Sequence, residues 1–372
     1  MITSFKYPFL DLRVVNEPWI HELKARAAAV IDSGRYVGGP EVEAFENRLA
    51  DLTGSDYVVS CANGLDAIRL IYRALIELGR LKPGDEVAVP SNTYIASILA
   101  VTDCGLRPLF VEPDPSTMNL SGASVRKALT PATKSVLTVH LYGRAAYDSE
   151  MEQLVRERNL ILIEDNAQAI GADAFNGVKT GNIGLAGAFS FYPTKNIGAL
   201  GDAGAVSTSD RTLAEAVRAL ANYGSLERYV NIYQGLNSRM DPLQAAFLNL
   251  KLESLEDECR RRRVLAGIYG ETITNPLVVK PLNEDSGQVW HQYVVRVSNR
   301  ESFRSFLAER GVQTDVHYPL PPHRQQCYKE YAHLNLPIAD KLASEVVSLP
   351  VSACTTPDDA CAIAGIINQY RD

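Results

Sequence analysis

The chain has 372 residues, of which 46% are hydrophobic and 22% charged, a composition that is ordinary for a soluble globular protein. This length predicts two domains. The formal net charge of −7 provides no basic surface for nucleic acid or for an anionic membrane, so we expect neither of them as a partner.

The cysteines and the N-terminal segment indicate the compartment. The six cysteines, at 61, 104, 259, 327, 354 and 361, form no CxxC pair and do not group with the six histidines at metal-ligand spacing. We therefore expect a reduced cytoplasmic enzyme without a structural metal. Residues 1–8 lack a long apolar core and a cleavage site, and no apolar run elsewhere approaches about 18 residues, so we expect neither export nor a membrane span.

The first informative element along the chain is a turn between a strand and a helix. A strand-like segment at 56–60 leads to the turn around Gly64, and an apolar helical pattern follows as far as residue 75. Backbone N–H groups at such a turn converge on an anion, so Gly64 predicts a phosphate site, with an ordinary turn as the alternative. The spacing is not that of a dinucleotide fingerprint or a P-loop, which argues against a nicotinamide or a nucleoside triphosphate.

Short strands alternate with helical patterns through the next part of the chain. The expected strands are 86–90, 108–111, 135–140, 160–164, 188–192 and 204–207. Repeated strand–helix units imply a mainly parallel sheet with helices on both faces, which is an α/β fold.

Two acids follow the strand expected at 160–164. Four consecutive aliphatic residues precede Glu164 and Asp165, which is typical of a buried parallel strand whose carboxyl end meets a ligand. One of the two carboxylates should therefore face a ligand. A buried aspartate needs a cationic partner, and the pyridinium nitrogen of pyridoxal phosphate (PLP) is one. The alternative is that Asp165 caps the next helix or pairs with a structural arginine.

Lys195 lies between an apolar strand and the glycine-rich stretch at 198–204, which is a poor place for a surface charge. Desolvation lowers the pKa of a lysine, so a lysine carried into a pocket becomes an amine nucleophile that can form a Schiff base. The alternative is the commoner one, a solvated surface lysine. The presence of Asp165 upstream favours the catalytic interpretation.

The rest of the chain predicts a smaller α/β unit. We expect one long helix at 243–263, whose four arginines at 260–263 indicate a solvated helix face. The strands and helices expected after it are 289–297, 300–310, 312–316 and 357–370. We place a large domain with an N-terminal arm at 1–250 and a small C-terminal domain at 251–372.

Together the segments around Gly64, Asp165 and Lys195 resemble fold type I PLP enzymes of the aspartate aminotransferase superfamily. More narrowly, the chain is similar to the DegT/DnrJ/EryC1/StrS family of nucleotide-sugar aminotransferases. The resemblance covers nearly the whole chain, and the other motifs that carry it are 8–12, 38–46, 83–87, 139–143 and 235–246. It implies a large PLP-binding domain and a smaller C-terminal domain.

The resemblance implies a catalytic pair and two further contacts to the cofactor ring. Lys195 would form the Schiff base and later move the proton, and Asp165 would pair with the pyridine nitrogen. Gln168 would lie against the phenolic oxygen, and Tyr94 would stack on the ring. Without the resemblance, Tyr94 is more simply interpreted as a core aromatic.

The resemblance also implies a phosphate site and a dimer. The amides of Gly64 and Leu65 and the hydroxyl of Ser190 would hold the phosphate. Many family members have Ser-Gly-Thr where this chain has Asn63-Gly64-Leu65, so a threonine hydroxyl near the phosphate is missing, but backbone amides can still hold the anion. Asn237 would reach into the neighbouring subunit's site, which implies an obligate homodimer with shared active sites.

Four residues are candidate substrate contacts. Arg239 lies two residues from Asn237 and would arrive from the partner subunit, although an exposed arginine is the commoner fate. The proline-rich loop at 317–323 would lie near the active-site entrance, so His317, Tyr318 and His323 could touch the sugar. The alternative is that these loop histidines are solvated or structural.

The resemblance implies transfer of an amino group from L-glutamate to a keto-deoxysugar linked to a nucleotide. The Asn-Gly-Leu-Asp form at 63–66, together with residues 198–202, is most similar to members that aminate C3 of a dTDP-3-keto-6-deoxyhexose. The alternatives are amination at C4 of a 4-keto sugar, a PLP-dependent sugar dehydratase or lyase, and an idle regulator. The dehydratase branch replaces the lysine with histidine, so Lys195 argues against it.

Overall fold

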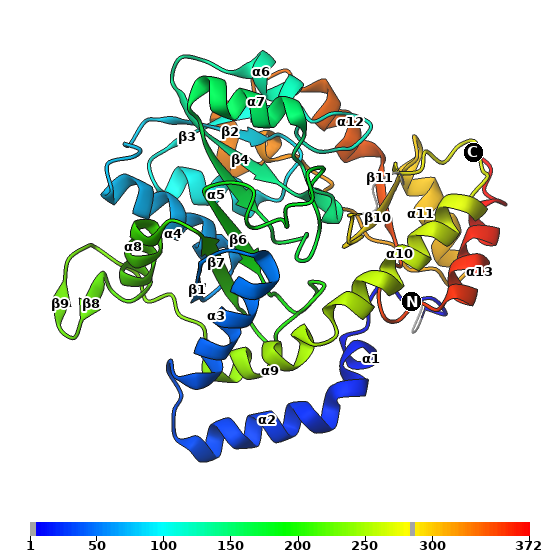
Figure 1. Cartoon of the computed structure of the whole chain (residues 1–372). Helices are drawn as coiled ribbons and strands as arrows, with labels where there is room; N and C mark the ends of the chain where they lie inside the picture. Colours follow the sequence, from blue (N-terminus) through cyan, green and yellow to red (C-terminus); the bar gives the residue numbers. More distant parts are fainter. Residues whose placement is uncertain (1–4, 283–286) are drawn as a thin grey trace.

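A seven-stranded sheet forms the centre of the molecule (Figure 1). The computed structural model describes residues 5–282 and 287–372. The strands are β1 (Tyr57–Cys61), β2 (Glu86–Pro90), β3 (Arg107–Val111), β4 (Thr133–Val139), β5 (Ile161–Asp165), β6 (Ala186–Ser190) and β7 (Gly204–Thr208). Their order across the sheet is β1-β7-β6-β5-β4-β2-β3, and only the pairs that β7 makes are antiparallel. The expected α/β fold with a mainly parallel sheet is confirmed.

Helices cover both faces of the sheet because successive residues of a strand point to opposite sides. In β2, Val87 and Val89 are buried in one core with α4 (Gly64–Glu77), α5 (Ile95–Asp103) and α8 (Arg211–Ala221). Ala88 lies between them and is buried in another core with α6 (Gly122–Ala128) and α7 (Ser149–Arg158). A short 3-10 turn at Leu141–Gly143 follows β4.

The N-terminal arm runs beneath this body (Figure 1). It consists of α1 (Leu12–Asn16), a 3-10 turn at Glu17–Trp19 and α2 (Ile20–Ser33), and it leads to α3 (Pro40–Thr53), which packs against β1. Leu23 of α2 is buried with Phe247 and Leu250 of α9 (Pro242–Leu252). The arm is therefore fixed to the body by apolar contacts with α9.

The prediction of one long helix at 243–263 is wrong. The chain instead forms α9 and a separate α10 (Leu255–Thr272), because the helix is interrupted at Ser254, whose hydroxyl donates a hydrogen bond to the Lys251 carbonyl. The expectation that the four arginines form a solvated face also needs correction. Arg262 is 5% exposed and pairs with Glu258 at 2.8 Å, because α10 turns this side toward the segment at 289–292.

A second, smaller group of elements surrounds the C-terminal core. The strands β10 (Tyr293–Arg296) and β11 (Val346–Leu349) pair antiparallel and share this core with α10, α11 (Arg300–Glu309) and α13 (Pro357–Ile367). The prediction of a strand at 312–316 is wrong, because this segment makes only isolated bridges, from Val312 to Tyr7 and from Asp315 to Ser348. The remaining elements are two 3-10 turns at Pro322–Arg324 and Gln326–Tyr331, α12 (Pro337–Glu345), and the hairpin β8 (Ser225–Glu227) and β9 (Val230–Asn231).

Neither a membrane-spanning helix nor a cluster of metal ligands is found among the described residues. None of their helices is both long and apolar enough to cross a membrane. Within the same residues, no three His, Cys, Asp or Glu side chains are grouped so that they could bind a metal ion. The division between domains at residue 250 stays a prediction.

Candidate active site

Asp165 is the last residue of β5 and is 6% exposed. Its Oδ2 accepts a hydrogen bond from the Ser97 hydroxyl at 2.7 Å, and its Oδ1 accepts one from the Ala167 backbone N–H at 3.1 Å. Ser97 comes from α5, so the orientation of the carboxylate is set by a helix and by the turn after its own strand. Both groups are neutral donors, so these two contacts leave the negative charge of Asp165 free to act on a cation.

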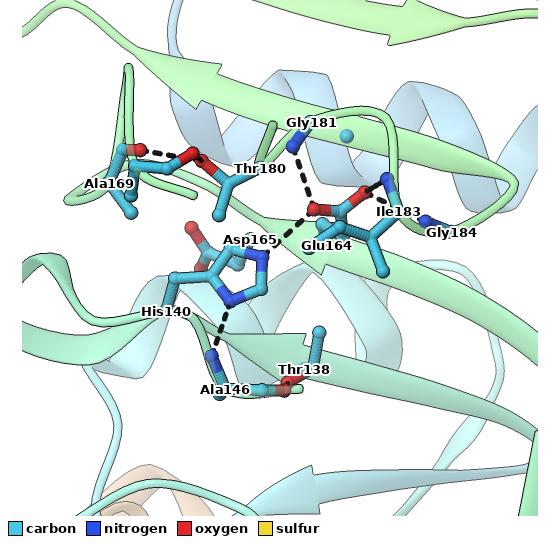
Figure 2. A network of polar contacts seen from close by, with 12 residues as sticks. Thr138, His140, Ala146, Glu164, Asp165, Ala169, Thr180, Gly181, Ile183 and Gly184 are labelled. Carbon is cyan, nitrogen blue, oxygen red and sulfur yellow. Dashed lines mark hydrogen bonds and ion pairs between the residues drawn. The ribbon is translucent and has the colours of Figure 1, made fainter. Parts of the chain in front are cut away.

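Glu164 lies on the other face of the strand and is fully buried (Figure 2). Its carboxylate accepts hydrogen bonds from the backbone N–H groups of Gly181, Ile183 and Gly184 at 2.7 to 2.9 Å and contacts His140 Nε2 at 2.9 Å. The Ala146 N–H points at His140 Nδ1, so Nδ1 is an acceptor and Nε2–H donates to Glu164. Protein groups therefore satisfy the buried Glu164, which leaves Asp165 as the acid that can face a ligand.

Lys195 lies in a tight loop after β6. The loop is closed by hydrogen bonds from the Lys195 N–H to the Tyr192 carbonyl and from the Ala199 N–H to the Phe191 carbonyl, both at 2.8 Å. Burial lowers the pKa of Lys195 to about 8, and the charge of Asp165 opposes that effect. The ammonium therefore lies within electrostatic range of Asp165, and a large fraction of the amine is unprotonated near pH 8.

Gly64 begins α4 and packs directly against Ser190 at the end of β6. A Cβ on Gly64 would lie 2.6 Å from the Ser190 Cβ, so only glycine allows this approach. Asn63 caps the helix by accepting the Asp66 N–H at 2.9 Å, and the Asp66 carboxylate is paired with Arg69 at 2.7 Å. The open helix N-terminus beside the Ser190 hydroxyl is a cradle that suits a phosphate group.

Three aromatic and amide side chains lie near these groups. Tyr94 is 53% exposed, so it is not a core aromatic, and its ring centroid is 5.2 Å from that of Tyr318. Gln168 donates to the Tyr318 hydroxyl at 3.0 Å and accepts the Tyr142 N–H at 2.7 Å. The structure therefore brings Tyr94, Gln168 and Tyr318 into contact with one another.

The loop at 317–323 places its two histidines differently. His317 approaches the site: its Nδ1 contacts the Ser348 hydroxyl at 2.8 Å, and the charge of Lys195 contributes to lowering its pKa, after burial. His323 is fully buried, with its Nε2 at 3.2 Å from Asp340 of α12 and its ring against Phe110. Because no part of His323 is accessible, we withdraw it as a substrate contact.

Asn237 and Arg239 lie in the segment that follows the β8–β9 hairpin. Asn237 is exposed, and Arg239 donates to the Asn222 side chain at 2.8 Å and lies over the Tyr223 ring. Between them, the Ser238 hydroxyl donates to Asp66 at 2.8 Å, which ties this segment to the first turn of α4.

Sequence analysis did not predict a role for two residues near Lys195. Asn196 follows Lys195 in the chain, and its side chain bonds to His291, which is buried and lies within electrostatic range of Lys195. His291 falls inside a segment that was expected to be a strand, so no sequence signal distinguished it from a core residue.

By its fold, this protein belongs to the class of the aminotransferases. A solved structure of S. venezuelae DesV matches 100% of both chains with a TM-score of 0.94 and 41% identity. A DegT DnrJ EryC1 StrS aminotransferase from Brucella abortus matches 97% of this chain and 98% of its own, with a TM-score of 0.89 and 34% identity.

The model of the DegT/DnrJ/EryC1/StrS aminotransferase family matches residues 19–368, and the chain belongs to this family. A dTDP-3-amino-3,6-dideoxy-alpha-D-galactopyranose transaminase of Aneurinibacillus thermoaerophilus is 45% identical over 98% of this chain and 99% of its own. A dTDP-3-amino-3,4,6-trideoxy-alpha-D-glucose transaminase of Streptomyces venezuelae is 40% identical over 99% and 97%. The family resemblance predicted from the motifs is thus confirmed.

Proposed function

We propose that this protein is a PLP-dependent aminotransferase that moves an amino group from L-glutamate to C3 of a dTDP-linked 3-keto-6-deoxyhexose. The observation that carries the PLP part is the low-pKa Lys195, set within electrostatic range of Asp165 on the loop that follows Ser190, the residue against which Gly64 packs. The sugar and the ring carbon rest on the printed activities of the two relatives at 45% and 40% identity.

The residues present fit PLP. The N-terminus of α4 suits the phosphate, with the amides of Gly64 and Leu65 and the hydroxyl of Ser190 as donors, because Gly64 lets the helix approach Ser190 so closely that a Cβ there would lie 2.6 Å from the Ser190 Cβ. Asp165 is a buried acceptor for the protonated ring nitrogen, since its contacts to Ser97 and Ala167 leave its charge uncompensated.

The remaining contacts in the proposal are Gln168 at the phenolic oxygen, Tyr94 on the ring face and, from the neighbouring subunit, Asn237. Of the four substrate contacts expected from the sequence, His317, Tyr318 and Arg239 are kept. Bound PLP supplies an electron sink for the carbon that carries the amino group.

The protein's own groups then have three tasks. Lys195 Nζ accepts and returns the proton that moves during transfer, because a pKa of about 8 gives it both a free amine and an ammonium under working conditions. Ser97 and the Ala167 amide hold Asp165 in one orientation. Tyr94, half exposed and with its ring tilted by 36° against that of Tyr318, excludes water from one side.

The titration of Lys195 gives a prediction with a defined sign. In cofactor-free protein, reductive methylation of Lys195 by formaldehyde and cyanoborohydride should accelerate as pH rises toward about 8 and then level, because only the free amine condenses with formaldehyde. In Asp165→Asn the midpoint should move below that of the wild type, since the charge that raises the pKa is gone. Mass spectrometry of the Lys195 peptide measures both. A midpoint near the ordinary lysine value of about 10.4 would contradict the assignment.

The proposal includes a cytoplasmic homodimer with shared active sites. The cysteines at 61, 104, 259, 327, 354 and 361 are free thiols, as in a reducing compartment. In support of the dimer, the β8–β9 hairpin projects from the body (Figure 1). Several apolar side chains in and beside this hairpin are exposed. They are Tyr223, Leu226, Tyr229, Val230 and Ile232. Such a patch is expected to be covered by another protein surface.

Mixing two inactive variants tests the shared site. Lys195→Ala and Asn237→Ala homodimers should each be inactive or nearly so. After co-refolding or co-expression, the mixture should recover about a quarter of the wild-type activity, because random pairing gives one intact site in half of the dimers. If each site were built within one subunit, no activity would return. Sedimentation of the mixture checks that dimers form.

The choice of ring carbon is tested with two acceptors. With L-glutamate as donor, dTDP-3-keto-6-deoxyhexose should be aminated with a kcat/KM at least about tenfold above that for the 4-keto isomer, in line with the discrimination expected from one misplaced polar group. Production of 2-oxoglutarate and the amino sugar is followed by chromatography. A preference for the 4-keto sugar would replace the C3 assignment by the C4 alternative. Elimination of a hydroxyl without gain of nitrogen would indicate a dehydratase.

A further inference from the structure

His291 is a buried histidine beside Lys195 that the proposed chemistry has not used. We propose that His291 is a positioning residue of the reaction: a neutral ring, protonated on Nδ1, that fixes Asn196 and thereby the loop that carries Lys195. This inference deepens the proposed function and rests on it. His291 acts through Asn196, so it is a positioning residue and not a catalytic one.

The hydrogen bonds around Asn196 determine the tautomer of His291. The Asn196 Nδ2 donates to the Val289 carbonyl at 3.3 Å, so its Oδ1 is the atom that faces His291 Nδ1, at 2.9 Å. An amide oxygen only accepts, so Nδ1 carries the proton. Rotating the amide by half a turn would set its oxygen against the Val289 carbonyl, where neither atom can donate.

The surroundings keep this ring neutral. His291 is 6% exposed. Burial, followed by the charges of Lys195, Arg262 and His317, lowers its pKa well below the usual range. A proton added to Nε2 would place a second cation beside the Lys195 ammonium in a poorly solvated site. The ring therefore carries one proton, and the bond to Asn196 places it on Nδ1.

The backbone around His291 is held rigidly. The buried Arg262 donates to the carbonyls of Trp290 and His291 at 3.3 and 3.2 Å, and the Val289 N–H donates to the Gly143 carbonyl at 2.9 Å. A Cβ on Gly143 would lie 2.7 Å from the backbone nitrogen of His291, so the close approach of these two segments requires glycine. The ring is thus a fixed support that does not depend on a mobile loop.

The loop that carries Lys195 is held at two points just after the lysine, at Asn196 and at Gly198. His291 holds it at Asn196, and Lys251 of α9 donates to the Gly198 carbonyl at 2.6 Å. Lys195 follows the turn that begins at Pro193, against which Gly198 is closely packed. Loss of the contact at Asn196 frees the residue adjacent to the reacting amine, and a small displacement of a reacting group costs much of its rate.

Two substitutions of His291 separate positioning from other roles. In His291→Asn the amide Nδ2 takes the place of Nδ1 and keeps the donor for Asn196 Oδ1, whereas in His291→Gln the amide lies further out, where Nε2 stood. Covalent attachment of PLP to Lys195, trapped with borohydride and followed by mass spectrometry, should stay within about twofold of wild type in His291→Asn. It should slow about tenfold in His291→Gln and in Asn196→Ala, and kcat should fall with it while KM changes little.

Two further measurements complete the test: the rate of the double variant His291→Gln/Asn196→Ala and the tautomer of the His291 ring. Because His291→Gln and Asn196→Ala break the same contact, the double variant should be no slower than either single variant. In cofactor-free protein labelled with ¹⁵N-histidine, the His291 resonances should be those of an Nδ1–H ring. An Nε2–H ring, additive losses in the double variant, or a His291→Asn variant as slow as His291→Gln would each overturn the inference.

Failure of the proposed function gives a different result. A folded wild-type protein that takes up no PLP would refute the cofactor assignment. The same variants are then compared by reductive methylation of Lys195 with formaldehyde, where the Asn variant should again match wild type and the Gln variant should differ from it.

Discussion

Replacement of Lys195 by alanine is expected to abolish turnover, with kcat lower by at least about 10⁴-fold, because both the covalent link to the cofactor and the proton carrier are lost. Cofactor binding should persist without a covalent bond, since Asp165, Ser190 and the Gly64 cradle are unchanged. Turnover with L-glutamate and the keto sugar measures the first effect. Borohydride treatment followed by mass spectrometry measures the second.

Two controls sharpen this result. Lys195→Arg keeps a cation near Asp165 but cannot lose its proton, so it should be as inactive as alanine. Lys251 is the matched control for a buried lysine: burial also lowers its pKa to about 8, but its ammonium donates to the Gly198 carbonyl, and Asp165 has no influence on it. Lys251→Met should still attach PLP at Lys195, although more slowly than wild type because the loop loses its bond at the Gly198 carbonyl. Turnover above about 1% in Lys195→Arg would remove the catalytic role from Lys195.

The sheet and the position of the two acids could be predicted because both depend on local pattern. A run of aliphatic residues ending in Glu164 and Asp165 indicates a buried strand and its carboxyl edge wherever it occurs. Which acid is satisfied could not be predicted. That choice depends on the N–H groups of Gly181 and Gly184 and on His140, which the fold brings to Glu164 from other parts of the chain.

The errors have the same physical origin. The break at Ser254 depends on a side chain competing for a backbone carbonyl, while the apolar and charged pattern around it continues to favour a helix. His291 was missed because a buried histidine in a strand-like segment has no sequence pattern that distinguishes a support for Lys195 from a core residue. Its role depends on Asn196 and Arg262, which approach it from two other segments.

Glu164→Gln tests the separation of the two acids through stability. The new side-chain amide would present an NH₂ group to one pair of the donors that now face the carboxylate, either Gly181 and His140 or Ile183 and Gly184. Two buried donors would lose their acceptor, so the free energy of unfolding should fall by about 3 kcal/mol. Urea unfolding at neutral pH, with the slope compared between variants, measures the loss.

Asp165→Asn is the matched substitution at the next residue and should behave in the opposite way. Its amide oxygen can still accept the Ala167 N–H, and its NH₂ can donate to the Ser97 hydroxyl, which rotates to accept, so the loss of stability should stay within about 1 kcal/mol. Its turnover should nevertheless fall by at least about 10²-fold, because the charge that would hold the ring nitrogen protonated is gone. The folded fraction of Glu164→Gln should keep most of its kcat. Equal losses of stability in the two variants would show that both carboxylates are structural, and Asp165 would then not be the acid that faces the cofactor.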